Sequence, residues 1–224
     1  VLVTGSKGFI GKNLLLALRL RNDIVVLEYD LDSNPSSLVT YVETADFIFH
    51  LAGVNRPKEE REYDEGNHLM TKYIVDTLQQ AGRKTPILLS SSVQADLDNP
   101  YGRSKRAAEN AVHSHAQHGG SAYIFRLPSV FGKWCKPNYN SVVATFCHNT
   151  ARGLPIDIRE PARELTLVHI DDVVEAFLLA LDGGTLEQDG VCSVSVTYRI
   201  SVTQLAALIK SIHTQWRTME IPSF

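Results

Sequence analysis

The chain has 224 residues, a formal net charge of −3 and three cysteines. This length fits one α/β domain, or one domain with a small appended lobe, and it is enough to bury a substantial core. The near-neutral charge gives no electrostatic reason to expect binding to nucleic acid or to an anionic membrane surface. We find no signal peptide and no apolar run of the roughly 18 residues that a membrane span requires. Few, widely spaced cysteines fit a reducing compartment, so we expect a cytoplasmic protein.

Strand and helix signals alternate along the first half of the chain. Short apolar runs predict buried strands, and the stretches between them have the spacing of helices. The predicted strands are residues 1–3, 24–27, 47–51, 87–89 and 123–127. The predicted helices between them are residues 12–20, 68–80 and 104–116. This alternation predicts an α/β fold with a doubly wound, Rossmann-like parallel sheet.

The regular alternation of strand and helix signals changes after Gly132. Residues 133–140 form a loop rich in Trp, Cys, Pro and Asn, and further helices are predicted at residues 142–151, 171–181 and 204–212. We expect one extended unit, with a Rossmann core at about residues 1–132 and 166–182. A small substrate lobe at about residues 133–165 and 183–224 would lie over the carboxyl edge of the sheet, where such sheets bind ligands.

Two candidate ligand sites are read from residue type and spacing. Gly5, Gly8 and Gly11 lie between the first predicted strand and the helix that follows. Glycine there permits a tight turn or a close approach to a pyrophosphate, whose charge the free N–H groups at a helix start attract. The spacing is G-x-x-G-x-x-G, and such turns also serve packing, so both interpretations stay open for this motif alone.

His113, His115 and His118 are interpreted as a solvated helix face rather than a metal site.

Tyr101 and Lys105 are four residues apart and therefore share one face of a predicted helix. A free Tyr has a pKa near 10 and is a poor acid–base catalyst at neutral pH. We expect the Lys105 ammonium to favour the phenolate and lower that pKa. Ser92 ends a buried strand upstream and can hold a carbonyl oxygen beside the tyrosine. Tyr-x-x-x-Lys alone is uninformative, but together with this serine and the glycine-rich turn it indicates a nucleotide-dependent redox enzyme.

These motifs together resemble the extended short-chain dehydrogenases/reductases, the NAD-dependent epimerase/dehydratase superfamily. The matching segments span nearly the whole chain: Thr4-Gly-Ser-Lys-Gly-Phe-Ile-Gly11, His50-Leu-Ala-Gly53, Ser90-Ser-Ser92, Pro100-Tyr-Gly-Arg-Ser-Lys105, Arg126-Leu-Pro-Ser-Val-Phe-Gly132 and Val168-His-Ile-Asp-Asp172.

A narrower resemblance is to the capsular polysaccharide synthesis reductases of the UDP-N-acetyl-L-fucosamine pathway. It is carried by His50-Leu-Ala-Gly-Val-Asn-Arg-Pro57, Ser90-Ser-Ser-Val-Gln-Ala95, Asp98-Asn-Pro-Tyr-Gly102 and Gly132-Lys-Trp-Cys-Lys-Pro-Asn-Tyr-Asn-Ser-Val142. It implies NADPH-dependent reduction of the C4 ketone of a UDP-2-acetamido-2,6-dideoxy-hexos-4-ulose to the L-talose sugar nucleotide. That family carries a C-terminal cupin domain. We expect this chain to be the reductase half, because it stops at Phe224, before a cupin domain could fit.

The resemblance also implies roles for individual residues. Tyr101 would protonate the C4 oxygen, Ser92 would hold the carbonyl, and Lys105 would tune Tyr101 and bind the nicotinamide ribose. The implied cofactor contacts are Gly5, Lys7, Gly8, Phe9, Ile10, Gly11, Leu51, Ala52, Gly53, Arg126, Leu127, Pro128 and Ser129. The expected substrate contacts are Arg56, Lys133, Trp134, Lys136, Asn138, Asn140 and Arg163. We also expect a homodimer.

Two departures from the family pattern affect ligand assignments. Leu165 stands where many members have an arginine for the nucleotide diphosphate, although Arg163 is close by in sequence. Glu28 and Asp30 end the second predicted strand, where an acid normally binds the ribose of NAD and repels the 2′-phosphate of NADP. Lys7 could offset this repulsion, and we rank NADP(H) first with NAD as the alternative.

Two other functions stay open. One is a nucleotide-sugar epimerase with tightly bound NAD, and the other is a non-catalytic dinucleotide sensor on the same fold. A dehydratase is disfavoured, because Val93 and Gln94 follow Ser92 where dehydratases carry acids. Sensors commonly lose the Tyr–Lys pair that this chain keeps.

Overall fold

The computed structural model describes residues 1–184, 187–188 and 190–218 of the chain. Its contacts divide the chain into two compact units. The first comprises Val1–Leu127 and Asp171–Ser195, and the second comprises Pro128–Ile170 and Val196–Phe224. Each unit is described by itself below.

The first unit is built on a sheet with the strand order β2-β1-β3-β4-β5-β9-β8. Its strands are β1 (Leu2–Thr4), β2 (Leu27–Tyr29), β3 (Ile48–His50), β4 (Ile87–Ser92), β5 (Ala122–Leu127), β8 (Glu187–Gln188) and β9 (Val191–Cys192). All neighbouring pairs are parallel except β8 with β9. The strand order reverses between the neighbouring strands β1 and β3, and doubly wound sheets bind their ligands at such a point. The predicted fold class is therefore confirmed.

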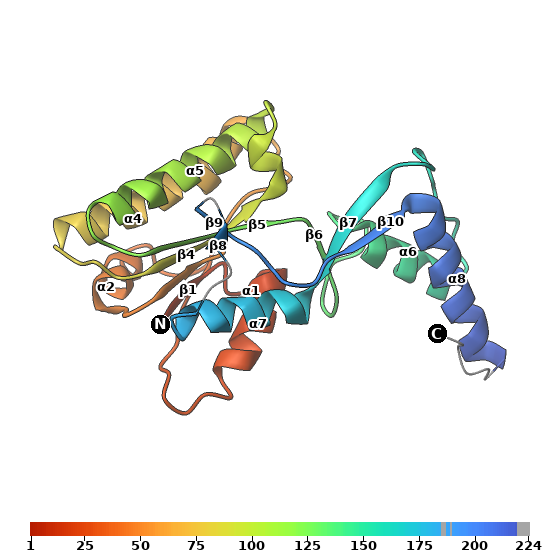
Figure 1. The fold of residues 1–224 in the computed structure, drawn as a ribbon, viewed down its shortest axis with the longest axis horizontal. Coiled ribbons are helices and arrows are strands. Elements are labelled where there is room, and N and C mark those ends of the chain that lie inside the picture. The colour runs from red at the N-terminus through yellow and green to blue at the C-terminus, as the bar shows by residue number, and fades with distance from the viewer. Residues whose placement is uncertain (185–186, 189, 219–224) are drawn as a thin grey trace. The chain divides into compact units, whose positions relative to one another are not determined.

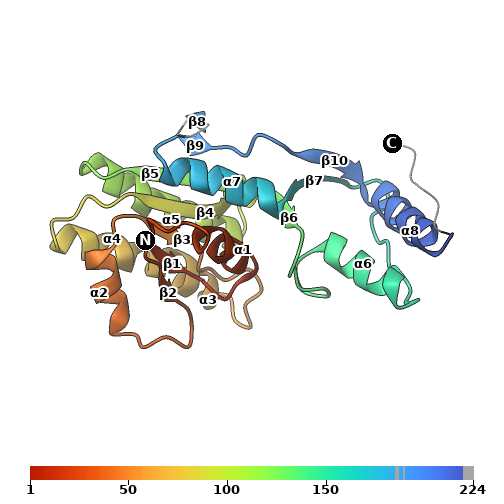
Figure 2. The same cartoon turned by 90° about the horizontal axis from the view of Figure 1, so that it is seen from below.

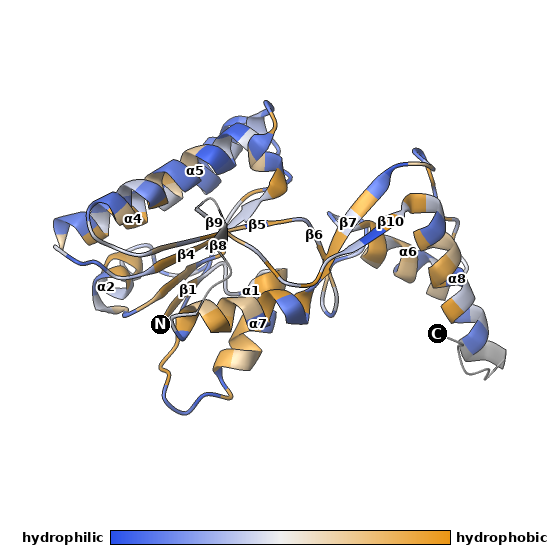
Figure 3. Cartoon of the chain, in the orientation of Figure 1, coloured by the Kyte–Doolittle hydropathy of each residue, from blue (hydrophilic) through white to orange (hydrophobic). Residues whose placement is uncertain are grey.

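Helices cover both faces of this sheet (Figure 1, Figure 2). They are α1 (Phe9–Leu18), α2 (Ser37–Thr44), α4 (Met70–Gln80), α5 (Pro100–Gln117) and α7 (Ile170–Leu181). Side chains of α2, α4 and α5 pack with β1, β3, β4 and β5 in one buried cluster. On the other face, the Phe177 ring of α7 lies 5.0 Å from that of Phe125 and 6.3 Å from that of Phe49. Figure 3 shows the polar sides of α4 and α5 facing away from the apolar strands.

Two short helical segments precede α4. They are α3 (Arg61–Tyr63) and the π-helical turn η1 (Asp64–Leu69), and a 3₁₀ turn η2 (Val93–Asp96) follows β4. The sequence analysis predicted neither α2 nor these turns. It also placed the second strand at 24–27, whereas β2 is Leu27–Tyr29. This strand is at the sheet edge and pairs only with β1, so its position is set by register rather than by a long buried apolar run.

The second unit contains a three-stranded sheet of order β10-β7-β6. Its strands are β6 (Ser129–Phe131), β7 (Glu164–His169) and β10 (Tyr198–Ser201), and its helices are α6 (Val142–Ala151) and α8 (Val202–Thr218). Phe146 of α6 and Leu205 and Ile209 of α8 form its core with Leu167 of β7. The expected boundaries differ from the observed ones. Residues 166–170 belong here because β7 pairs with β6 and β10, while residues 183–195 belong to the first unit because β9 pairs with β5.

The interpretation of His115 as part of a solvated face is wrong. Its side chain is buried, and its Nε2 lies 2.8 Å from the carbonyl oxygen of Thr85. The described residues hold no group of three or more His, Cys, Asp or Glu side chains that could bind a metal ion. No helix in the described ranges is long and apolar enough to cross a membrane.

Candidate active site

The catalytic candidates come together because a buried strand and a capped helix meet end to end. Ser92 is the last residue of β4 and the N-cap of η2. Its Oγ accepts a hydrogen bond from the Gln94 N–H. Asn99 then caps α5 by accepting from the Gly102 N–H at 2.8 Å, and Pro100 occupies the first helical turn. This short connection places Tyr101 in the first turn of α5, and its phenol lies beside the Ser92 hydroxyl.

The environment of Tyr101 keeps its phenol protonated. Burial raises its pKa above the ordinary value, the Ser92 hydrogen bond opposes this, and the nearby Tyr63 raises the pKa further. The Tyr63 and Tyr101 rings are 5.5 Å apart and tilted by 55°, an arrangement typical of packed aromatic pairs. At neutral pH, Tyr101 therefore carries a proton that it can donate.

Lys105 follows one turn later on α5 and is buried. Its Nζ donates to the carbonyl oxygen of Ser90 at 2.9 Å. Burial lowers the pKa of this ammonium to about 8, although Glu109 opposes the effect. The expectation that Lys105 lowers the pKa of Tyr101 is not met, because burial of the phenol has the larger effect and raises it.

The three glycines of the first turn have different roles. Gly5 has φ +68, and a Cβ there would lie 2.7 Å from the Ala52 nitrogen. A Cβ at Gly11 would lie 2.2 Å from the Gly5 carbonyl oxygen. Internal packing therefore requires both of these glycines. A Cβ at Gly8 would meet only the Gly5 oxygen, at 3.1 Å. Gly8 is the N-cap of α1, and no side chain in the described part of the chain caps it. The backbone N–H groups of the first turn of α1, which starts at Phe9 and Ile10, are thus suited to bind an anion.

Residues 51–53, which we expect to contact the cofactor, lie beside this turn. The Leu51 N–H donates to the Thr4 carbonyl at 3.2 Å, and the Ala52 N–H donates to Thr4 Oγ1 at 3.3 Å. A Cβ at Gly53 would lie 3.3 Å from Lys105 Nζ. The segment therefore connects the glycine-rich turn to Lys105 within the first unit.

Acids at the end of β2 are already engaged. Arg19 Nη2 lies 2.6 Å from Glu28 Oε1, and Asp30 accepts from the backbone N–H of Lys7 at 2.7 Å. The Lys7 ammonium forms an ion pair with Asp32, and this hydrogen bond raises the pKa of the lysine. The Lys7 side chain thus lies beside the acids that the sequence analysis identified.

Arg126 is held by protein carboxylates. Its guanidinium binds both oxygens of Glu109, at 3.0 and 2.7 Å, and one oxygen of Asp96 at 2.7 Å. Leu127 is buried at the end of β5 and pairs with Ser92. The remaining two cofactor candidates, Pro128 and Ser129, belong to the second unit.

The expected substrate contacts fall into two groups. Arg56 is an exposed residue of the first unit, in the segment after β3. The others belong to the second unit and are exposed: Lys133, Trp134, Lys136, Asn138, Asn140 and Arg163. In the 133–140 loop, the Lys136 Nζ lies 5.6 Å from the centroid of the Tyr139 ring. Trp134 and Asn138 have φ of 67 and 54, which non-glycine residues rarely adopt.

Three side chains at the site escaped the sequence analysis. Asn67 is buried in η1, accepts from the Val54 N–H and donates to the Ser104 hydroxyl. Tyr63 packs on Tyr101, and Glu109 binds Arg126. Glu109 alone had a local signal, because it continues the four-residue spacing from Tyr101 through Lys105. The other two depend on α3 and the π turn, which no pattern predicted.

A parallel α/β sheet, a glycine-rich first turn and a Ser–Tyr–Lys arrangement define the class of extended short-chain dehydrogenases/reductases. The profile of the "NAD dependent epimerase/dehydratase family" matches residues 1–191. The chain therefore belongs to the NAD dependent epimerase/dehydratase family.

Particular relatives agree with both resemblances drawn from the sequence. The chain is 47% identical over 207 residues to a UDP-2-acetamido-2,6-beta-L-arabino-hexul-4-ose reductase of Pseudomonas aeruginosa, covering 92% of this chain and 55% of the relative. The crystal structure of the capsular polysaccharide assembling protein CapF from Staphylococcus aureus matches with a TM-score of 0.89 and 38% identity, covering 99% of this chain and 60% of that one. The chain thus spans slightly more than half the length of these relatives, and the narrower resemblance is confirmed.

A more distant structure shows how widely the fold is shared. The UDP-glucuronic acid 4-epimerase of Bacillus cereus, solved in complex with NAD, matches with a TM-score of 0.83 at 17% identity. The match covers 95% of this chain and 84% of that one. At this identity the similarity concerns the fold alone.

Proposed function

We propose that the chain catalyses NAD(P)H-dependent reduction of the C4 ketone of a UDP-2-acetamido-2,6-dideoxy-hexos-4-ulose in capsule or O-antigen sugar-nucleotide synthesis. The observation that carries the proposal is the buried Tyr101 phenol beside the Ser92 hydroxyl, with its pKa raised by burial, in a chain 47% identical to a reductase of this substrate class. Reduction consumes a proton, so its acid must begin in the protonated form. An epimerase that begins by oxidising an alcohol needs the phenolate instead.

The residues of the first unit fit a dinucleotide. Gly8 leaves space at an α1 N-terminus without a side-chain cap, where N–H groups favour phosphate. Lys105 Nζ lies beside the Gly53 backbone. A dihydronicotinamide cofactor held by these residues would supply the hydride for the ketone carbon.

The side chains then control the oxygen of the ketone. Ser92 holds the carbonyl oxygen by a hydrogen bond, and Tyr101 transfers its phenolic proton to that oxygen as the C–H bond forms. The Lys105 ammonium stabilises the resulting phenolate until solvent restores the proton. A ketone, a hydride and a proton thus give the secondary alcohol.

We further propose NADPH as the preferred cofactor. Support comes from Arg19, which pairs with Glu28, and from the Lys7 cation, which lies within the same acidic group. Asp30 is also engaged, by the Lys7 backbone. These contacts reduce the charge that would repel a 2′-phosphate. The homodimer and the cytoplasmic location stay predictions.

The test is incubation of the purified chain with the 4-keto UDP-sugar and NADPH. We expect loss of reduced-nicotinamide absorbance and formation of one C4 alcohol, identified by NMR. Interconversion of C4 epimers without net cofactor oxidation would replace this function by that of an epimerase. Cofactor binding without any sugar conversion would favour the sensor.

A further inference from the structure

Glu109 extends the catalytic face of α5 by one more helical turn. Tyr101, Lys105 and Glu109 follow one another at intervals of four residues, so all three lie on the same side of the helix. The Glu109 side chain is only 3% exposed. A buried carboxylate is unfavourable unless it is paired and hydrogen-bonded, so its partners show what the position requires.

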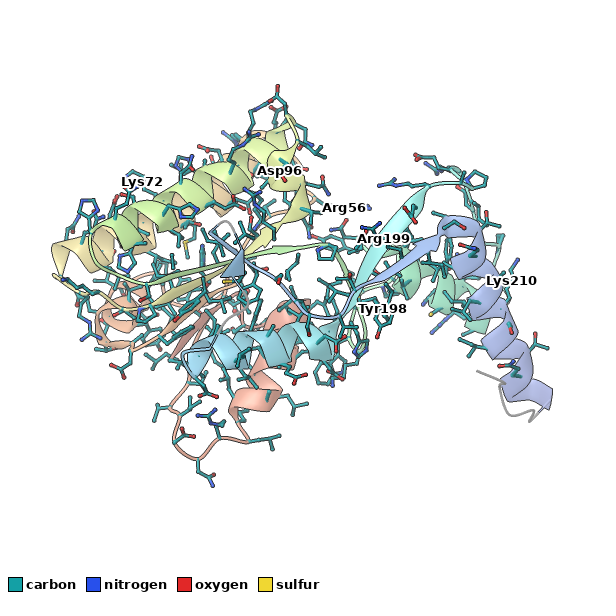
Figure 4. All side chains as sticks on the ribbon, viewed as in Figure 1. Arg56, Lys72, Asp96, Tyr198, Arg199 and Lys210 are labelled. Carbon is teal, nitrogen blue, oxygen red and sulfur yellow. The ribbon has the colours of Figure 1, made fainter. Side chains whose placement is uncertain are left out.

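The partners of Glu109 come from two strands of the sheet. Arg126 of β5 donates from Nε to Oε1 at 3.0 Å and from Nη2 to Oε2 at 2.7 Å. The Ser91 hydroxyl of β4 also donates to Oε1. The third nitrogen of the guanidinium, Nη1, binds Asp96 of η2 at 2.7 Å. Figure 4 shows Asp96 near one end of α5. One network of charged hydrogen bonds therefore joins α5, β4, β5 and η2.

This network is attached to each catalytic group. Ser91 lies between Ser90, whose carbonyl oxygen accepts from Lys105, and Ser92, whose hydroxyl lies beside the Tyr101 phenol. Ser92 also starts η2, the turn that Asp96 ends. A shift of α5 along β4 would disturb both catalytic pairs, and the Ser91–Glu109 bond opposes such a shift.

We propose that Glu109 and Arg126 are positioning residues, which form a brace that fixes the register of α5 against the ends of β4 and β5. The brace holds Ser92, Tyr101 and Lys105 in their reactive arrangement. Arg126 acts in this brace through its guanidinium rather than as a cofactor ligand. The inference rests on the proposed function only where it is tested by measuring kcat for the reduction.

The brace has an electrostatic consequence for Lys105. Its ammonium interacts electrostatically with Glu109 on α5 and with His50 on β3. His50 is neutral at working pH, because burial and Lys105 lower its pKa to about 3. The other charged groups of the network are Arg126, which pairs with Glu109, and Asp96, which pairs with Arg126. Both are connected to Lys105 by way of Glu109. Glu109 is therefore the group that favours the charged lysine, and its removal lowers the lysine pKa further.

The test compares Glu109→Gln with Arg103→Gln, which removes an exposed ion pair on the same helix. A displacement of about 1 Å in a catalytic site can cost about a hundredfold in rate, and we expect a fall in kcat of that order for Glu109→Gln. Cofactor affinity by calorimetry stays unchanged, and the alkaline limb of the kcat profile moves to lower pH. Arg103→Gln leaves all three measurements as in the wild type.

A substrate-free measurement separates this inference from the proposed function. Lys105 is titrated by NMR in ¹⁵N-lysine-labelled protein, with Lys105→Arg to assign the signal, and its pKa falls in Glu109→Gln. If the wild type reduces no keto sugar, the function fails, yet this titration still decides the brace. A folded Glu109→Gln with wild-type kcat and an unmoved lysine pKa overturns the brace.

A second variant covers the case in which Glu109→Gln does not fold. Ser91→Ala removes one donor and leaves the Arg126–Glu109 pair intact, so the protein remains folded. We expect a several-fold fall in kcat with unchanged cofactor affinity. A wild-type kcat in Ser91→Ala, or a loss confined to cofactor affinity, overturns the brace.

Discussion

The junction of β4 and α5 and the 133–140 loop both carry predicted functional residues, but they are built in different ways. At the junction, Ser92, Lys105 and Glu109 are buried and cross-bonded to neighbouring elements. In the loop, Trp134 is 56% exposed and has a positive φ. The difference teaches that the candidate proton-transfer groups are held by internal packing and hydrogen bonds, whereas the loop groups present polar and aromatic surface from a strained backbone. Changes at the junction should therefore affect kcat, and changes in the loop should affect KM.

The largest effect is expected for Tyr101→Phe. Positioned acid–base groups contribute about 10²- to 10⁴-fold to rates, so we expect kcat to fall by that factor. Cofactor affinity should stay within a few-fold, because phosphate binding depends on the glycine-rich turn. Tyr73→Phe, at a half-exposed tyrosine of α4, is the control. Lost cofactor binding with unchanged turnover per bound cofactor would contradict the catalytic role.

The next largest effect is expected for Gly8→Val, which tests whether the first turn binds the cofactor. The extended backbone of Gly8 is one that any residue adopts, and a side chain there would lie close to the Gly5 oxygen and occupy the space at the start of α1. We expect cofactor affinity to fall by about tenfold or more, which corresponds to a loss of about 1.4 kcal/mol of binding free energy. Calorimetry and thermal unfolding are measured on the same protein.

Gly11→Ala is the matched comparison within this turn. Its Cβ would overlap the Gly5 carbonyl, and overpacking of this kind typically costs about 1–3 kcal/mol of stability. Gly11→Ala should thus destabilise folding, while Gly8→Val weakens binding. Equal cofactor affinity in Gly8→Val and wild type would mean that all three glycines serve packing.

A smaller effect is expected for Lys136→Ala, which tests whether the loop recognises the sugar nucleotide. A hydrogen bond to a charged group is worth about 1.5–3 kcal/mol, so loss of a phosphate contact should raise KM by about tenfold with little change in kcat. Lys210→Ala, at an exposed lysine of α8 (Figure 4), is the control. An unaltered KM, together with no ligand protection of the loop in hydrogen exchange, would favour a packing role.

The smallest effect concerns cofactor choice at the end of β2. Turnover is compared with NADH and NADPH at matched, subsaturating concentrations, in the wild type and in Asp32→Asn. The substitution releases Lys7 from its ion pair, so we expect the NADPH preference to rise by a few-fold. An acid about 4 Å from a phosphate costs about 1 kcal/mol in water-like surroundings and more where it is partly buried. A wild-type preference for NADH of about tenfold or more would therefore reverse the ranking.

The sequence alone was sufficient for the fold class and the family, and it supplied Ser92, Tyr101 and Lys105 as the predicted catalytic residues. Strand–helix alternation indicates a parallel sheet, because each buried strand needs an apolar run and each crossover needs an amphipathic helix. Tyr101 and Lys105 share a helix face whatever surrounds them, and Ser92 ends a run that can only be a buried strand. These are local consequences of residue type and period.

Only the tertiary structure decided what depends on neighbours distant in the chain. Sheet pairing placed β7 in the second unit, and burial raised the pKa of Tyr101 where its sequence neighbour Lys105 suggested the opposite. Packing separated Gly8 from the two glycines that the fold itself requires. Desolvation and steric contact depend on atoms that surround a residue in space, and a local pattern does not specify those atoms. For the same reason, the sequence did not specify the partners of Arg126, which are Glu109 of α5 and Asp96 of η2.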